Sequence, residues 1–244
     1  MQLLQRILSC IFLLVLLSAC KKEVPEIILS NDAFPIPAGF PKIEFPADND
    51  FTIDRWKLGK KLFYEKALSL SNTVSCGSCH KPELAFSDNV ALSLGDEGVV
   101  GRSNSPTLTN VAYHPYFTRA GGVPTLEMQI LVPIQEHDEF NTNIVDVANK
   151  LKLIPEYADA AQKCYNRDMD PFVITRAIAT FERSLVSGNS RYDAYTQKGE
   201  FDALNMQEKR GLKLFLSEKT NCSKCHTGFD FTNYAFENNG LYTC

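Results

Sequence analysis

The chain contains 244 residues, of which 44% are hydrophobic and 22% are charged, and its formal net charge is −4. These values are ordinary for a globular protein, and the length suffices for one large domain or two small ones. The negative charge argues against nucleic acid as a partner, because nucleic-acid binding usually requires a basic face.

Residues 1–19 predict a signal peptide rather than a part of the fold. Arg6 provides a positive start, and the apolar run from Ile7 to Leu17 is too short to span a bilayer. The sequence Leu17-Ser-Ala-Cys20 resembles a bacterial lipobox, which implies that Cys20 becomes the lipidated first residue of the mature protein. The alternative is plain signal cleavage that leaves Cys20 as a free thiol. Both interpretations predict export, and the first predicts a periplasmic lipoprotein anchored to a bacterial membrane.

Residues 20–46 predict a lipidated N-terminus followed by a proline-rich linker. Five prolines lie between residues 21 and 46, and the segment shows little periodicity. Because proline is excluded from helix interiors, we expect an extended tether or a strap that lies on the surface.

Helical patterns begin after this linker. Apolar residues recur at helical spacing in residues 53–63, 144–151, 174–185 and 212–216. Asp170 followed by Pro171 is typical of a helix start, and Asn205 with Glu208 has the spacing of a capping box. No segment shows sustained strand alternation. The predicted fold class is therefore mainly α, with long loops.

A short pattern occurs twice in the chain. Gly59-Lys-Lys-Leu-Phe63 and Gly211-Leu-Lys-Leu-Phe215 each precede a Cys-x-x-Cys-His sequence, and these two sequences begin 146 positions apart, at Cys76 and Cys222. Two amphipathic helices could agree by chance, but both lie just upstream of the same cysteine pattern. We therefore interpret the repeat as one cytochrome-like unit used twice.

The cysteine pattern predicts two covalently bound c-type haems. The sites are Cys76-Gly-Ser-Cys79-His80 and Cys222-Ser-Lys-Cys225-His226. In such a site each thiol forms a thioether with a haem vinyl group, and the histidine ligates the iron. A zinc site would normally need the two cysteine pairs much closer in sequence, and a thioredoxin-like pair needs no following histidine. Export also supplies the compartment in which c-type haem is attached.

The remaining cysteines and histidines receive weaker predictions. Cys164 and Cys244 could pair in an oxidising compartment, but the sequence does not show that they are close, so neither is given a role. The sixth ligand of each iron decides between electron transfer and peroxide binding. His114 and His137 are the two histidines outside the motifs, and for each of them a place on the surface or in the core is the plainer interpretation.

From about Phe45 onward the chain resembles the bacterial di-haem cytochrome c peroxidases, the group that contains MauG. The matching stretches are Leu58 to Phe63, Cys76 to Phe86 (CGSCHKPELAF), Gly101 to Asn110 (GRSNSPTLTN), Leu126 to Glu139 (LEMQILVPIQEHDE) and Asn221 to Phe231 (NCSKCHTGFDF). The resemblance implies two class I cytochrome c domains in tandem with one haem each and a Ca²⁺ ion between them. It implies an N-terminal peroxidatic domain over residues 47–200 and the start of a C-terminal electron-transfer domain over residues 201–244.

The same resemblance implies roles for individual residues. The haem of His80 would be peroxidatic, and electrons would enter through the haem of His226. Glu139 matches the catalytic acid–base carboxylate, and Gln129 matches an amide of the same pocket. Asn104 matches a residue that contributes to the calcium site.

Three departures qualify the resemblance. Asp96 follows Leu94-Gly95 at the position where reductively activated relatives have a distal histidine, so we expect a peroxidatic haem without a sixth protein ligand; His114 or His137 is the alternative ligand. Arg119-Ala-Gly121 stands where many relatives have Trp-Asp-Gly, and the only tryptophan is Trp56. Only 18 residues follow His226, so we expect a C-terminally truncated sequence whose sixth ligand to the second haem lies beyond residue 244.

The functional prediction is a cytochrome c peroxidase that reduces hydrogen peroxide to water. Electrons would come from a small periplasmic donor, either a cytochrome c or a cupredoxin. One alternative is a di-haem electron-transfer cytochrome without catalysis, and another is a MauG-like oxidase of a protein substrate. A membrane contact through the lipid anchor is expected, whereas the oligomeric state, including a homodimer, is left open.

Overall fold

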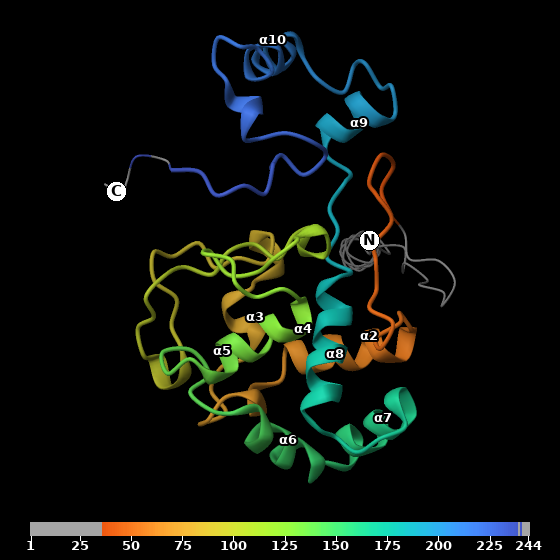
Figure 1. The fold of residues 1–244 in the computed structure, drawn as a ribbon, viewed down its shortest axis with the longest axis vertical. Coiled ribbons are helices and arrows are strands. Elements are labelled where there is room, and N and C mark those ends of the chain that lie inside the picture. Colours follow the sequence, from red (N-terminus) through yellow and green to blue (C-terminus); the bar gives the residue numbers. More distant parts are fainter. Residues whose placement is uncertain (1–35, 239, 241–244) are drawn as a thin grey trace, which may run out of the picture. The chain divides into compact units, whose positions relative to one another are not determined.

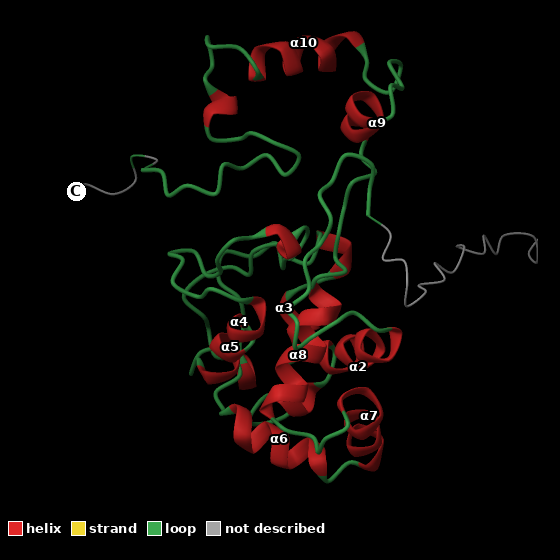
Figure 2. Cartoon of the chain, turned by 45° about the vertical axis from the view of Figure 1, so that its right-hand side comes forward, coloured by secondary structure: helices red, strands yellow, loops and turns green. Residues whose placement is uncertain are grey.

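The computed structural model describes residues 36–238 and 240, and within them the fold is helical (Figure 1). The helices are α2 (Ile53–Phe63), α3 (Cys76–Cys79), α4 (Leu126–Gln129), α5 (Leu131–Gln135), α6 (Ile144–Lys152), α7 (Pro155–Tyr165), α8 (Pro171–Glu182), α9 (Arg191–Gln197) and α10 (Met206–Phe215). The described part contains isolated β-bridges but no strand, and long loops join the helices (Figure 2). The mainly α class is confirmed, whereas the division into two cytochrome domains at residues 200 and 201 stays a prediction.

The helices expected from periodicity and caps form where the sequence places them. Asp170 accepts a hydrogen bond from the amide of Val173 at 2.9 Å and begins α8. Asn205 and Glu208 form the expected capping box at the start of α10, with reciprocal bonds of 2.9 and 2.7 Å. These contacts satisfy amide groups that have no partner inside the helix.

Sequence reasoning missed α7 and α9, although both carry start signals. Pro155 occupies the first turn of α7, and the helix ends at Asn166 in a left-handed conformation. Ser190 and Asp193 form a second capping box at the start of α9. The capping residues of both helices can be recognised in the sequence, but the apolar stripe of each helix is weak.

Helix α8 is the centre of the core, because nearly all of its surface is buried. Ala177 and Ile178 are fully buried, and α2 packs along this side of α8. At Gly59 of α2 an added Cβ would lie 1.8 Å from the carbonyl oxygen of Ala177. The glycine of the first repeat therefore permits close contact between the two helices, and Phe63 one turn later is fully buried beside α8.

The second copy of the repeat lies in a different setting. Nothing lies within 4 Å of a Cβ added at Gly211, and α10 has no buried residue in the described part of the chain. The glycine of α10 thus has no packing role among these residues.

Residues 36–46 form the extended strap that their prolines predict. They contain no helix, Ile43 within the segment is buried, and the carbonyl of Pro41 accepts a hydrogen bond from the Tyr113 hydroxyl at 3.0 Å. The signal peptide, Cys20 and Cys244 lie outside the described residues. Among the helices of residues 36–238, none is long and apolar enough to cross a bilayer.

Candidate functional site

The first haem motif lies on a single helical turn. The amide of Ser75 donates to Ser78 Oγ at 2.9 Å and begins α3, and the amide of His80 closes the turn on the carbonyl of Cys76 at 2.8 Å. Cys76 and Cys79 are three positions apart on this turn, which brings their thiols to the same side. Burial raises the pKa of both thiols, and neither takes part in a disulfide.

His80 is oriented by a main-chain group. Its Nδ1 lies 2.8 Å from the carbonyl oxygen of Phe86. A carbonyl can only accept, so Nδ1 carries the proton and Nε2 presents its lone pair. Burial also lowers the pKa of His80, which keeps the imidazole neutral at pH 7. A neutral imidazole with an anchored Nδ1 is the form that ligates iron.

The second motif repeats this local geometry. Nδ1 of His226 donates to the carbonyl of Phe231 at 3.1 Å, and the amide of His226 donates to Cys222 at 2.9 Å. The ring centroid of Phe215 lies 6.4 Å from that of His226 and 5.8 Å from that of Phe231. In the first motif the corresponding distances from Phe63 to His80 and Phe86 are 6.5 and 6.1 Å.

The backbone extends this correspondence. Phe86 and Phe231 both adopt left-handed conformations, with φ of 58° and 54°. Such a conformation is uncommon for an aromatic residue, and here it turns the carbonyl toward the histidine. Sequence reasoning missed these two residues; comparing the two copies beyond the histidines would have found them. The cysteines and histidines of both motifs could therefore each hold a c-type haem.

Gln129 presents an unpaired side-chain oxygen. Among the described residues, its Oε1 is a buried side-chain acceptor without a hydrogen-bond partner. Such groups are rare and call for a polar partner that the protein does not itself provide. Gln129 ends α4, so the amide is held on a helix rather than on a loop. An orphaned acceptor of this kind can take a hydrogen bond from a small polar molecule.

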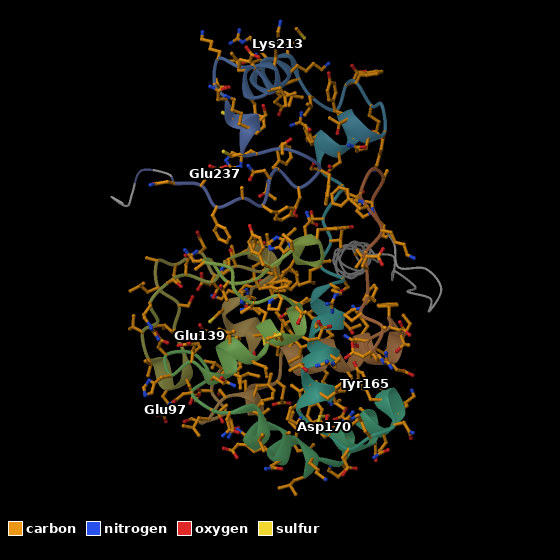
Figure 3. All side chains as sticks on the ribbon, in the orientation of Figure 1. Glu97, Glu139, Tyr165, Asp170, Lys213 and Glu237 are labelled. Atoms are coloured by element: carbon orange, nitrogen blue, oxygen red, sulfur yellow. The ribbon has the colours of Figure 1, made fainter. Side chains whose placement is uncertain are left out.

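Glu139 lies on the loop that follows α5 (Figure 3). Glu139 is an exposed residue, yet desolvation of its carboxyl group raises its pKa, and the charges of Asp138 and Glu136 raise it further. The loop of Glu139 is connected to the first motif through residues 94–96, because Cys79 Sγ donates to the Leu94 carbonyl at 3.6 Å and the amide of Asp96 donates to the Glu139 carbonyl at 2.7 Å. A carboxyl group with a raised pKa is suited to accept and return a proton.

Arg102 holds two acids, Glu136 and Asp138, that precede Glu139. Its guanidinium donates to Asp138 at 2.8 and 3.2 Å and to Glu136 at 2.9 Å. The positive charge partly offsets the increase in the pKa of Glu139. Sequence reasoning missed Arg102, because nothing local connects it with an acidic run more than thirty positions away.

Asp96 does not present its carboxylate as a free ligand. It is 3% exposed and accepts hydrogen bonds from Ser69 Oγ at 2.8 Å, the amide of Ser71 at 2.9 Å and Thr73 Oγ1 at 2.5 Å. Burial alone would raise the pKa of Asp96, but these donors outweigh burial and lower it to about 2.

The two histidines outside the motifs have separate surroundings. His114 lines a cavity of about 190 Å³ with Phe117 and Arg183, stacks on Phe117, and has its pKa lowered by burial. His137 is exposed. Trp56 belongs to the α2–α8 contact, because its ring centroid lies 6.0 Å from that of Phe181, and its Nε1 donates to Ser184 Oγ, just after α8, at 2.8 Å.

The oxygens of Asn104 have a partner other than a metal ion. The Arg119 guanidinium donates to the Asn104 carbonyl at 2.9 Å and also to its side-chain Oδ1. In the described ranges no three histidine, cysteine, aspartate or glutamate side chains group as metal ligands. Residues with this arrangement do not fit a calcium ion at Asn104, because a guanidinium already occupies the position that a cation would take.

Cys164 keeps no assigned role. Its thiol is free within residues 36–238 and its pKa is raised by burial, while its carbonyl accepts a hydrogen bond from Arg55 Nε at 3.2 Å.

Comparisons with known proteins agree with this arrangement. A family model described as di-haem cytochrome c peroxidase matches residues 54–201. The methylamine utilization protein MauG of Methylorubrum extorquens is 34% identical over 82% of this chain and 56% of its own length. The cytochrome c551 peroxidase of Pseudomonas aeruginosa is 36% identical over 76% of this chain and 54% of its own.

Solved structures show the same fold. A MauG-like protein associated with microbial copper homeostasis has a TM-score of 0.77 and 29% identity, with 86% of this chain and 65% of that chain covered. The diheme peroxidase BthA of Burkholderia thailandensis has a TM-score of 0.66 and 27% identity, covering 75% and 53%. This chain spans little more than half the length of the two curated relatives named above. The family match extends over more than half of residues 1–244, and the chain belongs to the di-haem cytochrome c peroxidase family.

Proposed function

We propose that this protein reduces hydrogen peroxide to water at the His80 site. A haem held by Cys76, Cys79 and His80 would supply the iron to which peroxide binds. The balanced reaction takes one H₂O₂, two electrons and two protons and yields two water molecules. Electrons enter through the site of His226 from a small periplasmic protein, a cytochrome c or a cupredoxin.

Glu139 moves the proton that breaks the oxygen–oxygen bond. Its carboxylate accepts a proton from the inner peroxide oxygen and returns it to the outer oxygen, which then leaves as water. The unpaired Oε1 of Gln129 accepts a hydrogen bond from the bound molecule and orients it. The observations that support the proposal are the raised pKa of the Glu139 carboxyl group and the orphaned side-chain oxygen of Gln129.

The test is Glu139→Gln in the haem-loaded protein. We expect both haems to be retained and turnover to fall by about 10²- to 10⁴-fold, the usual contribution of a general acid–base group. Glu156→Gln on the exposed surface of α7 is the matched control and should keep full turnover. A loss below about tenfold in Glu139→Gln would mean that the proton takes another route.

Two alternatives make different predictions. A di-haem electron-transfer cytochrome would exchange electrons normally in Glu139→Gln and show no peroxide turnover in the wild type. A MauG-like oxidase, which the similarity to MauG favours, would consume peroxide in a Glu139-dependent manner but accept electrons from a protein substrate instead of a small donor.

The cellular location belongs to the same proposal. Cys20 would carry the lipid, and the proline-rich strap would act as a spacer from the membrane. Cys20→Ala should release the protein from the membrane fraction. A variant that stays membrane-bound would show that something else anchors it.

A further inference from the structure

A buried carboxylate joins three loop segments next to Glu139. Asp96 receives its three hydrogen bonds from residues 69–73, which lie 23 to 27 positions earlier in the chain. Lys150 also binds this segment, because its Nζ donates to the Ser69 carbonyl at 2.7 Å and to Asn72 Oδ1 at 3.2 Å. Aspartate is almost never fully buried unless it is paired, so this network defines one position for residue 96.

The main chain beside this carboxylate holds the main chain of Glu139. The amide of Asp96 donates to the Glu139 carbonyl at 2.7 Å. A Cβ added at Gly95 would lie 2.2 Å from the Asp138 carbonyl oxygen and 2.8 Å from that of Glu139. Residue 95 therefore has to be glycine for the two loops to lie this close.

A second connection runs from the same donor segment to the loop of Glu139. The amide of Leu70 donates to the Phe140 carbonyl at 3.0 Å, directly after Glu139. Thr73 contributes twice, since its Oγ1 donates to Asp96 and accepts from the amide of Glu97 at 3.0 Å. Residues 69–73, 93–101 and 136–140 thus form one hydrogen-bonded unit, which we name the Asp96 clamp.

We propose that Asp96 is a positioning residue for Glu139: its side chain ties the 93–101 loop to residues 69–73, and its amide holds the carbonyl of Glu139 in place. This inference deepens the proposed function and rests on it for its catalytic consequence. Misplacement of a catalytic group by about 1 Å can lower a rate by about 10²-fold. A proton carrier on a loop needs such support, because loops are less precise than helices.

Asp96→Asn tests the clamp with little change in shape. The amide group can accept from Ser69 and Thr73, but its NH₂ then faces the N–H of Ser71, and two donors oppose each other. Thr73→Val keeps the side-chain volume but removes the hydroxyl that donates to Asp96 and accepts from the amide of Glu97. It is a milder second variant if Asp96→Asn does not fold. Asp170→Asn makes the same substitution at the cap of α8, where it removes the charge that pairs with Arg167 without touching the clamp, and it is the matched control for an Asp→Asn change.

The first readout is independent of catalysis. Hydrogen exchange of the haem-loaded full chain should show faster exchange in residues 93–101 and 136–140 for Asp96→Asn and Thr73→Val, and no such change for Asp170→Asn. Unchanged exchange in both segments would overturn the proposal, whatever the activity of the protein.

The second readout concerns turnover. We expect Asp96→Asn to lower kcat about 10- to 100-fold with a smaller change in KM for peroxide. In a double-mutant cycle, Asp96→Asn should add little to Glu139→Gln, because both act on the same proton transfer. Fully additive losses, or a kcat within about twofold of Asp170→Asn, would contradict a positioning role. If Glu139→Gln alone has no effect, the proposed function fails, and hydrogen exchange still decides whether the clamp exists.

Discussion

Nδ1 of His80 lies 2.8 Å from the carbonyl oxygen of Phe86, and Phe86 reaches that position through a left-handed backbone. His226 and Phe231 repeat the relationship in the second motif. A hydrogen bond at Nδ1 fixes both the tautomer and the plane of the ring, so each histidine is prepared for a ligand at Nε2.

The first prediction is therefore that the mature protein binds two haems through thioethers. The pyridine haemochrome spectrum should be c-type and correspond to two haems per chain, and acid–acetone extraction should release neither. Substituting both cysteines of one motif by serine, Cys76 with Cys79 or Cys222 with Cys225, should remove one haem and leave the other. One haem per wild-type chain would contradict this assignment.

The second prediction concerns the sixth position of the peroxidatic iron. Both oxygens of Asp96 are engaged by Ser69, Ser71 and Thr73, and a carboxylate is a poorer ligand for haem iron than neutral imidazole. We expect a high-spin ferric signal in low-temperature electron paramagnetic resonance of the oxidised protein, and a shift when cyanide is added. Purely low-spin bis-histidine signals, with activity only after pre-reduction, would show that His114 or His137 binds the iron.

The third prediction is a pH profile set by Glu139. As a general base in the free enzyme Glu139 must be deprotonated, so kcat/KM should fall as the pH drops through its pKa. Burial, with Asp138 and Glu136, raises that pKa, and the acidic limb should lie above the usual glutamate range. Asp138→Asn removes a like charge and should move the limb to lower pH. Glu139→Gln should abolish it; a limb that persists there belongs to another group.

The fourth prediction is that Asn104 holds no calcium ion. The Arg119 guanidinium already engages the carbonyl and the Oδ1 of Asn104. We expect metal analysis of the dialysed protein to give the same calcium content for Asn104→Ala as for the wild type, with the same haem spectra and turnover in both. The result that contradicts this is stoichiometric calcium that disappears in Asn104→Ala.

The fifth prediction is a large stability loss at a buried ion pair. Arg183 donates to the two carboxylate oxygens of Glu127 at 2.5 and 2.9 Å, and both side chains are under 10% exposed. Burial would raise the pKa of Glu127, but Arg183 lowers it. Glu127→Gln leaves a buried guanidinium without its counter-charge and should lower the free energy of unfolding by about 3–5 kcal/mol.

The control for this prediction is an exposed pair. Lys163 lies 3.0 Å from Asp54 with both side chains largely in solvent, so Lys163→Gln should cost less than about 1 kcal/mol. Denaturant unfolding of the haem-loaded proteins measures both values. Equal losses in the two variants would mean that the buried pair contributes no more than a surface contact.

The sequence by itself determined the features that depend on neighbouring residues. A haem motif needs two thiols and an imidazole within five positions, so Cys76 to His80 can be recognised without any knowledge of the fold. The N-caps Asp170 of α8 and Asn205 of α10 could be predicted in the same way, because a capping side chain binds amides two or three residues away. The family resemblance, carried by ordered short stretches, was confirmed by the match over residues 54–201.

Only the tertiary structure decided how the polar residues near the first motif are used. In the sequence, Asp96 was notable only because it takes the position of a distal histidine. In the structure, residues 23 to 27 positions earlier donate hydrogen bonds to its carboxylate and make it part of the Asp96 clamp. Asn104 likewise pairs with Arg119, 15 positions later. Whether a carboxylate is buried, and what donates to it, depends on desolvation and on contacts between distant segments, and no local pattern encodes either.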